Sequence, residues 1–202
     1  MNLLRDWLFT ATTVFFCAAA QAQRASPSPA LRDFSEQRIR HQKTLGFALG
    51  GYALANIAAG SIAAGQTSGE TKYVHQMNVY WNLFNLGIAG IGLLGSRKAN
   101  AKNETLAQAI KRHETMKQVL LLNAGLDVAY VVGGAYLRER SHSHPDKSDQ
   151  LQGYGKSIML QGGFLLAFDL VNYFVFKSRG DKQEIKLISA GPMGVGLVIP
   201  IR

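Results

Sequence analysis

The chain has 202 residues, of which 47% are hydrophobic and 17% charged, and its 22 lysines and arginines outnumber 13 aspartates and glutamates to give a net charge of +9. The mean hydropathy is nevertheless 0.00, because long apolar segments alternate with basic connections. This contrast is typical of membrane proteins whose basic connections contact anionic lipid head groups. No face interleaves basic and aromatic residues as nucleic-acid binding requires, so the composition excludes a nucleic-acid partner.

The first 22 residues have the pattern of a secretory signal peptide. Arg5 gives a weakly basic start, residues 8–20 are apolar, and Ala20-Gln21-Ala22 forms a cleavage site before Gln23. Cys17 is the single cysteine of the chain and lies in this segment. Cleavage would leave no thiol, which excludes disulfides, thiol nucleophiles and cysteine-bound metals from the mature chain. The alternative is an uncleaved first helix, which would give five spans.

Residues 23–32 are predicted to form an extended linker. Their Ser26-Pro27-Ser28-Pro29 run biases the backbone toward extended conformations, and Asp33 is the predicted N-cap of the first helix. Residues 33–180 are predicted to form one all-α domain. This domain contains four apolar segments, at residues 44–64, 77–95, 118–137 and 157–176.

Short connections pair these segments into two helical hairpins. Residues 66–69 form a glycine-containing turn, so the first two helices are expected to be antiparallel neighbours. Asn103 is the predicted cap of the third helix, and residues 138–152 are predicted to form a solvated loop. The expected fold is therefore an antiparallel four-helix transmembrane bundle. Residues 181–202 alternate enough to predict a short extended tail.

The polarity of the apolar segments favours membrane helices over a soluble bundle. A soluble bundle needs a wide charged stripe on each helix, whereas residues 45–64 and 77–95 contain no charged residue. Small residues such as Gly46 and Gly50 would let helices approach closely. We expect an integral protein of the inner membrane, inserted after export, with the lipid bilayer as its partner.

The distribution of positive charge conflicts with signal cleavage. The segments before the first helix, between the second and third, and after the fourth hold 16 lysines and arginines, whereas the other two connections hold 5. The positive-inside tendency places the first group in the cytoplasm. Cleavage after Ala22 places the new N-terminus outside. Five spans would remove the conflict, whereas the sharp cleavage site favours four.

Each predicted helix carries amide or carboxylate side chains on one face. Asn78, Asn82 and Asn85 are spaced by four and three residues, as on one face of a helix, and Tyr52 and Asn56 share a face of the first segment. These stripes predict a bundle with a polar interior. The candidate residues for a ligand or proton site in this interior are Asp127, Asp169, Asn82, Asn85, Asn123, Tyr130, Asn172 and Gln161.

Asp127 and Asp169 are the strongest candidates. A carboxylate in hydrocarbon costs at least ~2.5 kcal/mol, so each requires a partner or water. Each lies at a similar distance from the basic end of its segment, which predicts that they face each other. Such a pair would share a proton or bind a cation. The alternative is that neighbouring amides simply hydrogen-bond them. Leucine at either site is expected to cost more stability than at Asn78 or Ser61.

The motifs of enzymatic chemistry are missing from the sequence. It has no nucleophile elbow, no paired helical histidines and no glycine-rich phosphate loop. His142-Ser143-His144 has metal-ligand residue types, but in a hydrophilic loop it is predicted to be solvated. No catalytic residue and no cofactor is therefore predicted, and neither a bound metal nor a small ligand can be named.

Two classes of function remain. In the first, the asparagine- and aspartate-lined interior binds or conducts a proton, a cation or a small polar ligand; conduction through so thin a bundle would require a homo-oligomer. In the second, the protein is a non-catalytic structural or interaction protein of the envelope, and its polar interior only fixes helix packing.

Several motifs along the chain carry a family resemblance. They are Asn82-Leu83, Ile88-Ala89-Gly90-Ile91-Gly92, Asn123-Ala124-Gly125-Leu126-Asp127-Val128-Ala129-Tyr130, Gly153-Tyr154-Gly155 and Gln161-Gly162-Gly163-Phe164-Leu165-Leu166-Ala167-Phe168-Asp169. With them the chain resembles a family of small four-helix membrane proteins, a domain of unknown function found mainly in Bacteroidota. It departs from that pattern at Gly163 and at Ala124, where a hydroxyl residue is expected. The resemblance implies the helical architecture, assigns no activity, and marks Asp127 and Asp169.

Overall fold

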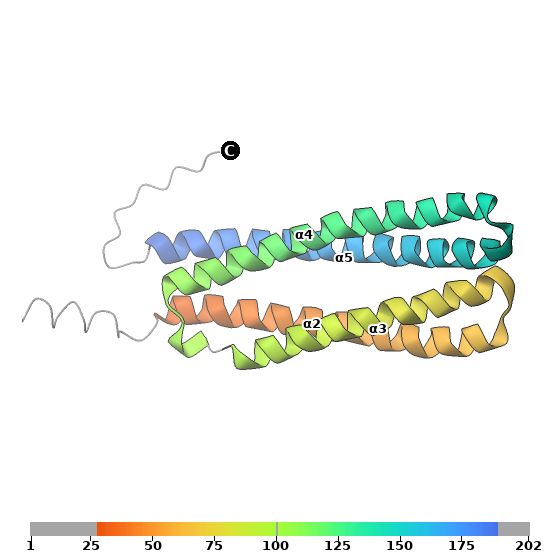
Figure 1. Cartoon of the computed structure of the whole chain (residues 1–202). Coiled ribbons are helices and arrows are strands. Elements are labelled where there is room, and N and C mark those ends of the chain that lie inside the picture. The colour runs from red at the N-terminus through yellow and green to blue at the C-terminus, as the bar shows by residue number, and fades with distance from the viewer. Residues whose placement is uncertain (1–27, 100, 190–202) are drawn as a thin grey trace, which may run out of the picture.

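Four long helices make up the protein in a computed structural model that describes residues 28–99 and 101–189 (Figure 1). No strand occurs in those residues. The signal peptide, the start of the linker and residues 190–202 of the predicted tail lie outside them. The helices are α2 (Pro29–Gln66), α3 (Gly69–Lys98), α4 (Leu106–Arg140) and α5 (Ser148–Ser189), and single 3-10 turns occur at Ala101–Asn103, Ser141–Ser143 and Pro145–Lys147.

The N-terminal ends of two helices differ from the sequence prediction. Helix α2 begins at Pro29, and the Ser28 hydroxyl caps it by accepting from Leu31 N at 3.2 Å, so the helix starts within the predicted linker. Proline is tolerated at the first helical position, where its missing N–H is not needed. Helix α4 is capped by Thr105 in a capping box with Gln108, not by Asn103.

Helix α5 extends well beyond the predicted bounds at both ends. It begins at Ser148, so most of the predicted loop over residues 138–152 is helix or 3-10 turn, and Gly153-Tyr154-Gly155 lies inside the helix. It continues to Ser189, so residues 181–189 are helical rather than extended. The ion pair of Lys177 with Asp181 at 2.7 Å, four residues apart on one helix face, supports the continuation. The alternating pattern of residues 181–202 had predicted an extended tail and did not indicate that the helix continues.

The helices lie side by side in two pairs, with each pair joined by a short connection (Figure 1). In the view of Figure 1, α2 and α3 form one pair and α4 and α5 the other, and α3 also packs on α5. The start of α2, the end of α3, the start of α4 and the end of α5 gather at one end of the bundle. We call this the basic end, because it collects the lysine- and arginine-rich segments.

Glycines permit the closest helix contacts. A Cβ atom on Gly155 of α5 would lie 2.5 Å from the carbonyl oxygen of Gly134 on α4, and one on Gly153 would lie 2.5 Å from that of Glu70 on α3. Any larger side chain would force these backbones apart. Small residues therefore set the distances between α5 and both of its neighbours.

The bundle is polar inside and apolar outside. The fully buried side chains include Asn82 and Ser157, whereas Phe84 is 65% and Ile91 74% exposed. Within the described residues, three helices, α2, α4 and α5, are long and apolar enough to cross a membrane. Helix α3 is not among them, although a fourth span was predicted there. Its three asparagines within eight residues lower its hydropathy.

Candidate ligand site in the polar interior

An amide network joins three helices in the middle of the bundle. Its centre is Asn78 on α3, whose side-chain oxygen accepts from the Gln161 amide on α5. Tyr52 on α2 donates in turn to the Gln161 oxygen at 2.9 Å. The Asn78 amide donates to the Asn56 side-chain oxygen on α2 at 3.2 Å, and Asn82 donates to the Asn78 oxygen at 3.0 Å. This chain of contacts fixes the register of α2, α3 and α5.

The network extends along α3 through two further buried amides. Asn82 is 0% and Asn85 2% exposed, and Asn85 donates to the Asn82 oxygen at 3.4 Å. Buried amides are costly unless they are paired, and here the members pair with one another. The predicted candidates Asn82, Asn85 and Gln161 thus belong to this network. Tyr52, Asn56 and Asn78 complete it, and their four-residue spacing on the predicted stripes was the signal for them.

Asp127 and Asp169 form a second polar group, between α4 and α5. Asp127 is 3% and Asp169 8% exposed. They are close enough for Asp169 to act electrostatically on Asp127, and the Asn123 side chain hydrogen-bonds to Asp169. The Asp127 Oδ2 atom is buried without a hydrogen-bond partner among the described residues. This carboxylate pair is therefore less well satisfied than the amide network.

Close packing of α4 against α5 holds the pair together. A Cβ atom on Gly162 of α5 would lie 3.1 Å from the carbonyl oxygen of Asp127 and 3.3 Å from Cβ of Tyr130. The neighbouring Gly163 has nothing within 4 Å of such an atom. Gly162 therefore permits the close contact of α5 with α4, whereas the space around Gly163 is open.

A pocket of about 1080 Å³ connects the carboxylate region with the basic end. Asp169 and Asn123 line its interior, and the ion pair of Arg38 with Glu104, 2.6 Å apart and almost fully buried, lines its other end. The sequence gave no sign of this ion pair, because its two residues are far apart in the chain. The walls between are largely apolar and come from all four helices; they include Leu45, Leu49, Ile88, Ala89, Val119, Leu120 and Phe168.

Two of the predicted site residues make other contacts. Tyr130 packs edge-on against Trp81, with ring centroids 4.7 Å apart. The Asn172 amide donates to the carbonyl oxygen of Phe168 in its own helix at 2.7 Å. Helical spacing placed both on the correct face of their helices, but it could not show whether a side chain turns to the interior or bonds locally.

The chemistry of the site is that of two carboxylates and nearby amides. Among the residues that the structure describes, no group of three histidine, cysteine, aspartate or glutamate side chains could hold a metal ion. His144 of the loop sequence instead contacts the carbonyl oxygen of Arg140 at 3.1 Å. Paired carboxylates can bind a proton between them or accept a cation together with amide oxygens.

Comparison with known proteins identifies the family. The model of a family of unknown function, DUF6992, matches residues 48–170, which include both the amide network and the carboxylate pair. The chain belongs to this family. No curated protein and no solved structure matches it.

Proposed function

We propose that this member of the DUF6992 family is an integral membrane protein that binds a proton or a cation at the Asp127 and Asp169 pair. The observation that carries the proposal is the buried, unpartnered Oδ2 atom of Asp127 beside a second buried carboxylate. In this proposal the four helices form two antiparallel hairpins in the bacterial inner membrane. Helices α2, α4 and α5 are apolar enough to cross it, and the less apolar α3, which packs on α2 and α5, crosses with them. The signal peptide would direct export and be cleaved after Ala22.

The membrane location rests on the exposed apolar surface. Leu122, Leu160 and Phe174 are each more than 60% exposed, and in water such surfaces would associate or aggregate. In a bilayer they contact lipid, and the polar interior is sealed from it. We expect the protein to remain in membranes after carbonate and high-salt washing, which removes electrostatically held proteins. Release into the supernatant would contradict the spanning arrangement.

The binding role rests on the unfavourable free energy of burying two carboxylates side by side. Two adjacent carboxylates in a dry interior repel each other, and each also loses its hydration on burial. Asn123 compensates one of them in part. A bound proton or monovalent cation would neutralise one of the two charges and so remove their repulsion, whereas a divalent cation would neutralise both. The pocket leading to Asp169 gives such a ligand a route from the basic end. Binding requires one chain, whereas conduction would require a homo-oligomer.

Linked stability tests this proposal. A ligand that binds only the folded state raises the unfolding temperature, and the rise grows with the logarithm of the ligand concentration once this exceeds the dissociation constant. We expect the purified protein in detergent to respond to pH or to one of Na⁺, K⁺ and Mg²⁺. Any cation response should be lost, and the pH response reduced, in Asp127→Asn and Asp169→Asn, whose amides keep the side-chain shape. Asp146→Asn, at an exposed position, is the matched control and should keep the wild-type response.

The structural role is the second candidate, and the amide network favours it. Its members satisfy one another across three helices, as polar contacts that fix helix packing should. If neither pH nor any of the cations shifts the unfolding temperature differently in the wild type and the two aspartate variants, this structural role replaces the binding role.

A further inference from the structure

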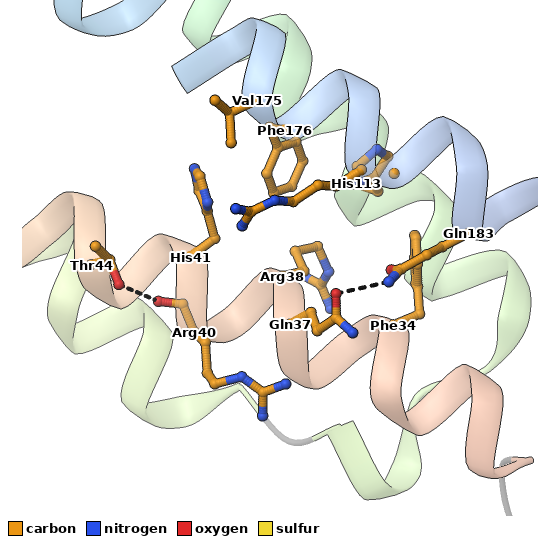
Figure 2. A pocket seen from close by; sticks show the side chains of 12 residues that line it. Phe34, Gln37, Arg38, Arg40, His41, Thr44, His113, Val175, Phe176 and Gln183 are labelled. Atoms are coloured by element: carbon orange, nitrogen blue, oxygen red, sulfur yellow. Dashed lines mark hydrogen bonds between the residues drawn. The ribbon is translucent and has the colours of Figure 1, made fainter. Parts of the chain in front are cut away.

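A second pocket, of about 510 Å³, opens at the basic end between α2, α4 and α5 (Figure 2). Three arginines and two histidines line it, and none of its lining residues is acidic. In Figure 2, His41 and Arg38 of α2 lie on the same side of the pocket as Phe34, while His113 and Phe176 lie across from them. Gln183 of α5 donates to Gln37 of α2 at 2.8 Å and ties the two helices together beside the pocket.

Arg38 brings a buried positive charge to the pocket wall. Its side chain is 4% exposed, and its NH2 group donates to both oxygens of Glu104 at 2.6 and 2.7 Å. Arg112 forms an ion pair with the same carboxylate at 2.8 Å, so two guanidinium groups share one negative charge. The Nε atom of Arg38 has no hydrogen-bond partner among the described residues. The pocket therefore keeps an excess of positive charge and a free buried donor.

The histidines add donors without adding charge. His113 stacks on Phe176 with ring centroids 4.3 Å apart, and His41 contacts the same ring at 5.3 Å. Burial lowers the pKa of His113 to about 4, helped by Lys117. Burial also lowers the pKa of His41, and the nearby Arg179 lowers it further. Both rings are therefore neutral at pH 7, and the buried Nε2 atom of His41 is unpartnered within the described residues.

We propose that this pocket binds the phosphate group of an anionic ligand. The planar guanidinium group of arginine matches the geometry of phosphate oxygens and binds them through charge-assisted hydrogen bonds. Neutral imidazoles supply further N–H donors. The apolar wall of Phe34, Val175 and Phe176 accommodates the organic part of a phosphate ester.

The place of the pocket in the fold suits this ligand chemistry. It lies at the end of the proposed spans, where phospholipid head groups lie and where free phosphate esters also have access. Both sources offer the same phosphate group to the pocket. The site is separate from the carboxylate pair, so it does not depend on ligand binding there, although a lipid as the source of the phosphate rests on the proposed membrane spans.

Arg179 is the residue that tests the site most cleanly. It lines the pocket, it is exposed at the end of α5, and none of the ion pairs of the described residues includes it. Arg40 also lines the pocket, but it contacts Glu36 at 3.4 Å and Asp33 at 3.8 Å. Replacing Arg179 therefore removes a phosphate contact without breaking a structural ion pair.

The test compares three probes by calorimetric titration of the full chain in detergent: inorganic phosphate, a short-chain phosphatidylglycerol, and the matching diacylglycerol, which lacks phosphate. We expect saturable binding of at least one phosphate probe and none of the diacylglycerol. Binding of phosphatidylglycerol alone would identify a lipid head group as the ligand, and binding of inorganic phosphate would identify a site open to free phosphate esters. Binding of neither phosphate probe would overturn the proposal.

Matched variants decide whether the binding is local to the pocket. Arg179→Gln and His41→Gln should each weaken it, the first by about tenfold, as expected for one lost charge-assisted hydrogen bond. Arg140→Gln carries the same change of charge at the opposite end of the bundle, also at an exposed position, and should bind as the wild type does. Equal weakening in Arg179→Gln and Arg140→Gln, or no weakening in Arg179→Gln, would overturn the site.

Discussion

The amide network and the carboxylate pair are both buried polar regions of one bundle, yet they differ in how their hydrogen-bonding capacity is used. In the network, Asn78 alone contacts three other side chains. In the pair, one oxygen of Asp127 has no partner in the described part of the chain. Buried groups that satisfy one another stabilise a single packing. A buried group that is left unsatisfied costs stability, and it is kept where it binds something.

This comparison reverses an expectation drawn from the sequence. If Asp127 and Asp169 face each other among buried amides, leucine at Asp127 strands their polar partners and is expected to cost more than leucine at Asn78. The contacts favour the opposite order, because Asn78→Leu removes the partner of the Gln161 amide and of the Asn56 side-chain oxygen on two other helices, whereas Asp127→Leu removes a group that is itself poorly paired. The number of partners left behind, and not the formal charge of the residue, sets the cost.

Asn78→Leu should have the largest effect on stability. We expect a loss of about 2 to 4 kcal/mol, since several interhelical hydrogen bonds disappear together and each contributes about 1 kcal/mol. Unfolding of the purified protein by denaturant measures it. Ser61→Leu, at an exposed position of α2, is the control and should stay near the wild type. A larger loss in Asp127→Leu than in Asn78→Leu would break the comparison.

His113→Gln should change the response to acid by a smaller amount. The pKa of His113 is about 4 in the fold and 6.5 as its ordinary value, so below pH 6.5 the unfolded chain binds a proton that the folded chain does not. Stability contributed by this group therefore falls from about pH 6.5 to about pH 4, by up to about 3 kcal/mol.

The variant serves the comparison by removing the contribution of His113 to the acid response and leaving those of His41 and of the carboxylate pair. We expect the unfolding free energy of His113→Gln to fall less steeply than that of the wild type over this pH window, even if its value at pH 7 is lower. Parallel pH profiles of the two proteins would show that the acid response arises elsewhere.

Gly162→Ala should have a smaller effect again, directed at the pair. The added methyl group would meet the Asp127 carbonyl oxygen and the Val131 side chain at 3.1 Å, which costs about 1 kcal/mol of overpacking. It should also separate α4 from α5 and weaken proton or cation binding. Gly163→Ala adds the same group where nothing lies within 4 Å. Identical unfolding temperatures and cation responses in the two variants would show that the close contact at Gly162 does not affect the carboxylate pair.

Local spacing in the sequence predicted the helices and much of the interior. The steps of three and four placed Asn82, Asn85 and Gln161 on inward faces, and Asp127 and Asp169, predicted to face each other, are both buried. The same rule could not distinguish Asn172, which bonds to its own helix, from Gln161, which bonds across helices. Nor could it find the pairing of Arg38 with Glu104, because a contact between residues 66 positions apart depends on tertiary packing.

The helix ends were the least predictable feature of the fold. Helix α5 continues past Lys177 because Asp181 pairs with Lys177 and with Lys117 of α4 at 3.3 Å. Gly180 also gives His113 room to pack against the helix. The contacts with Lys117 and His113 come from α4, so periodicity within residues 177–189 could not indicate them.

Infrared difference spectroscopy of the carboxyl groups tests the central claim most directly, that Asp127 and Asp169 together hold a proton or a cation. Spectra of the wild type in lipid would be recorded on changing pH and on exchanging cations, beside Asp127→Asn, Asp169→Asn and the exposed control Asp146→Asn. The account predicts a protonated carboxyl band, or a cation-dependent carboxylate shift, that is lost in both interior variants and kept in the control. Identical difference spectra in the wild type and both interior variants would contradict it.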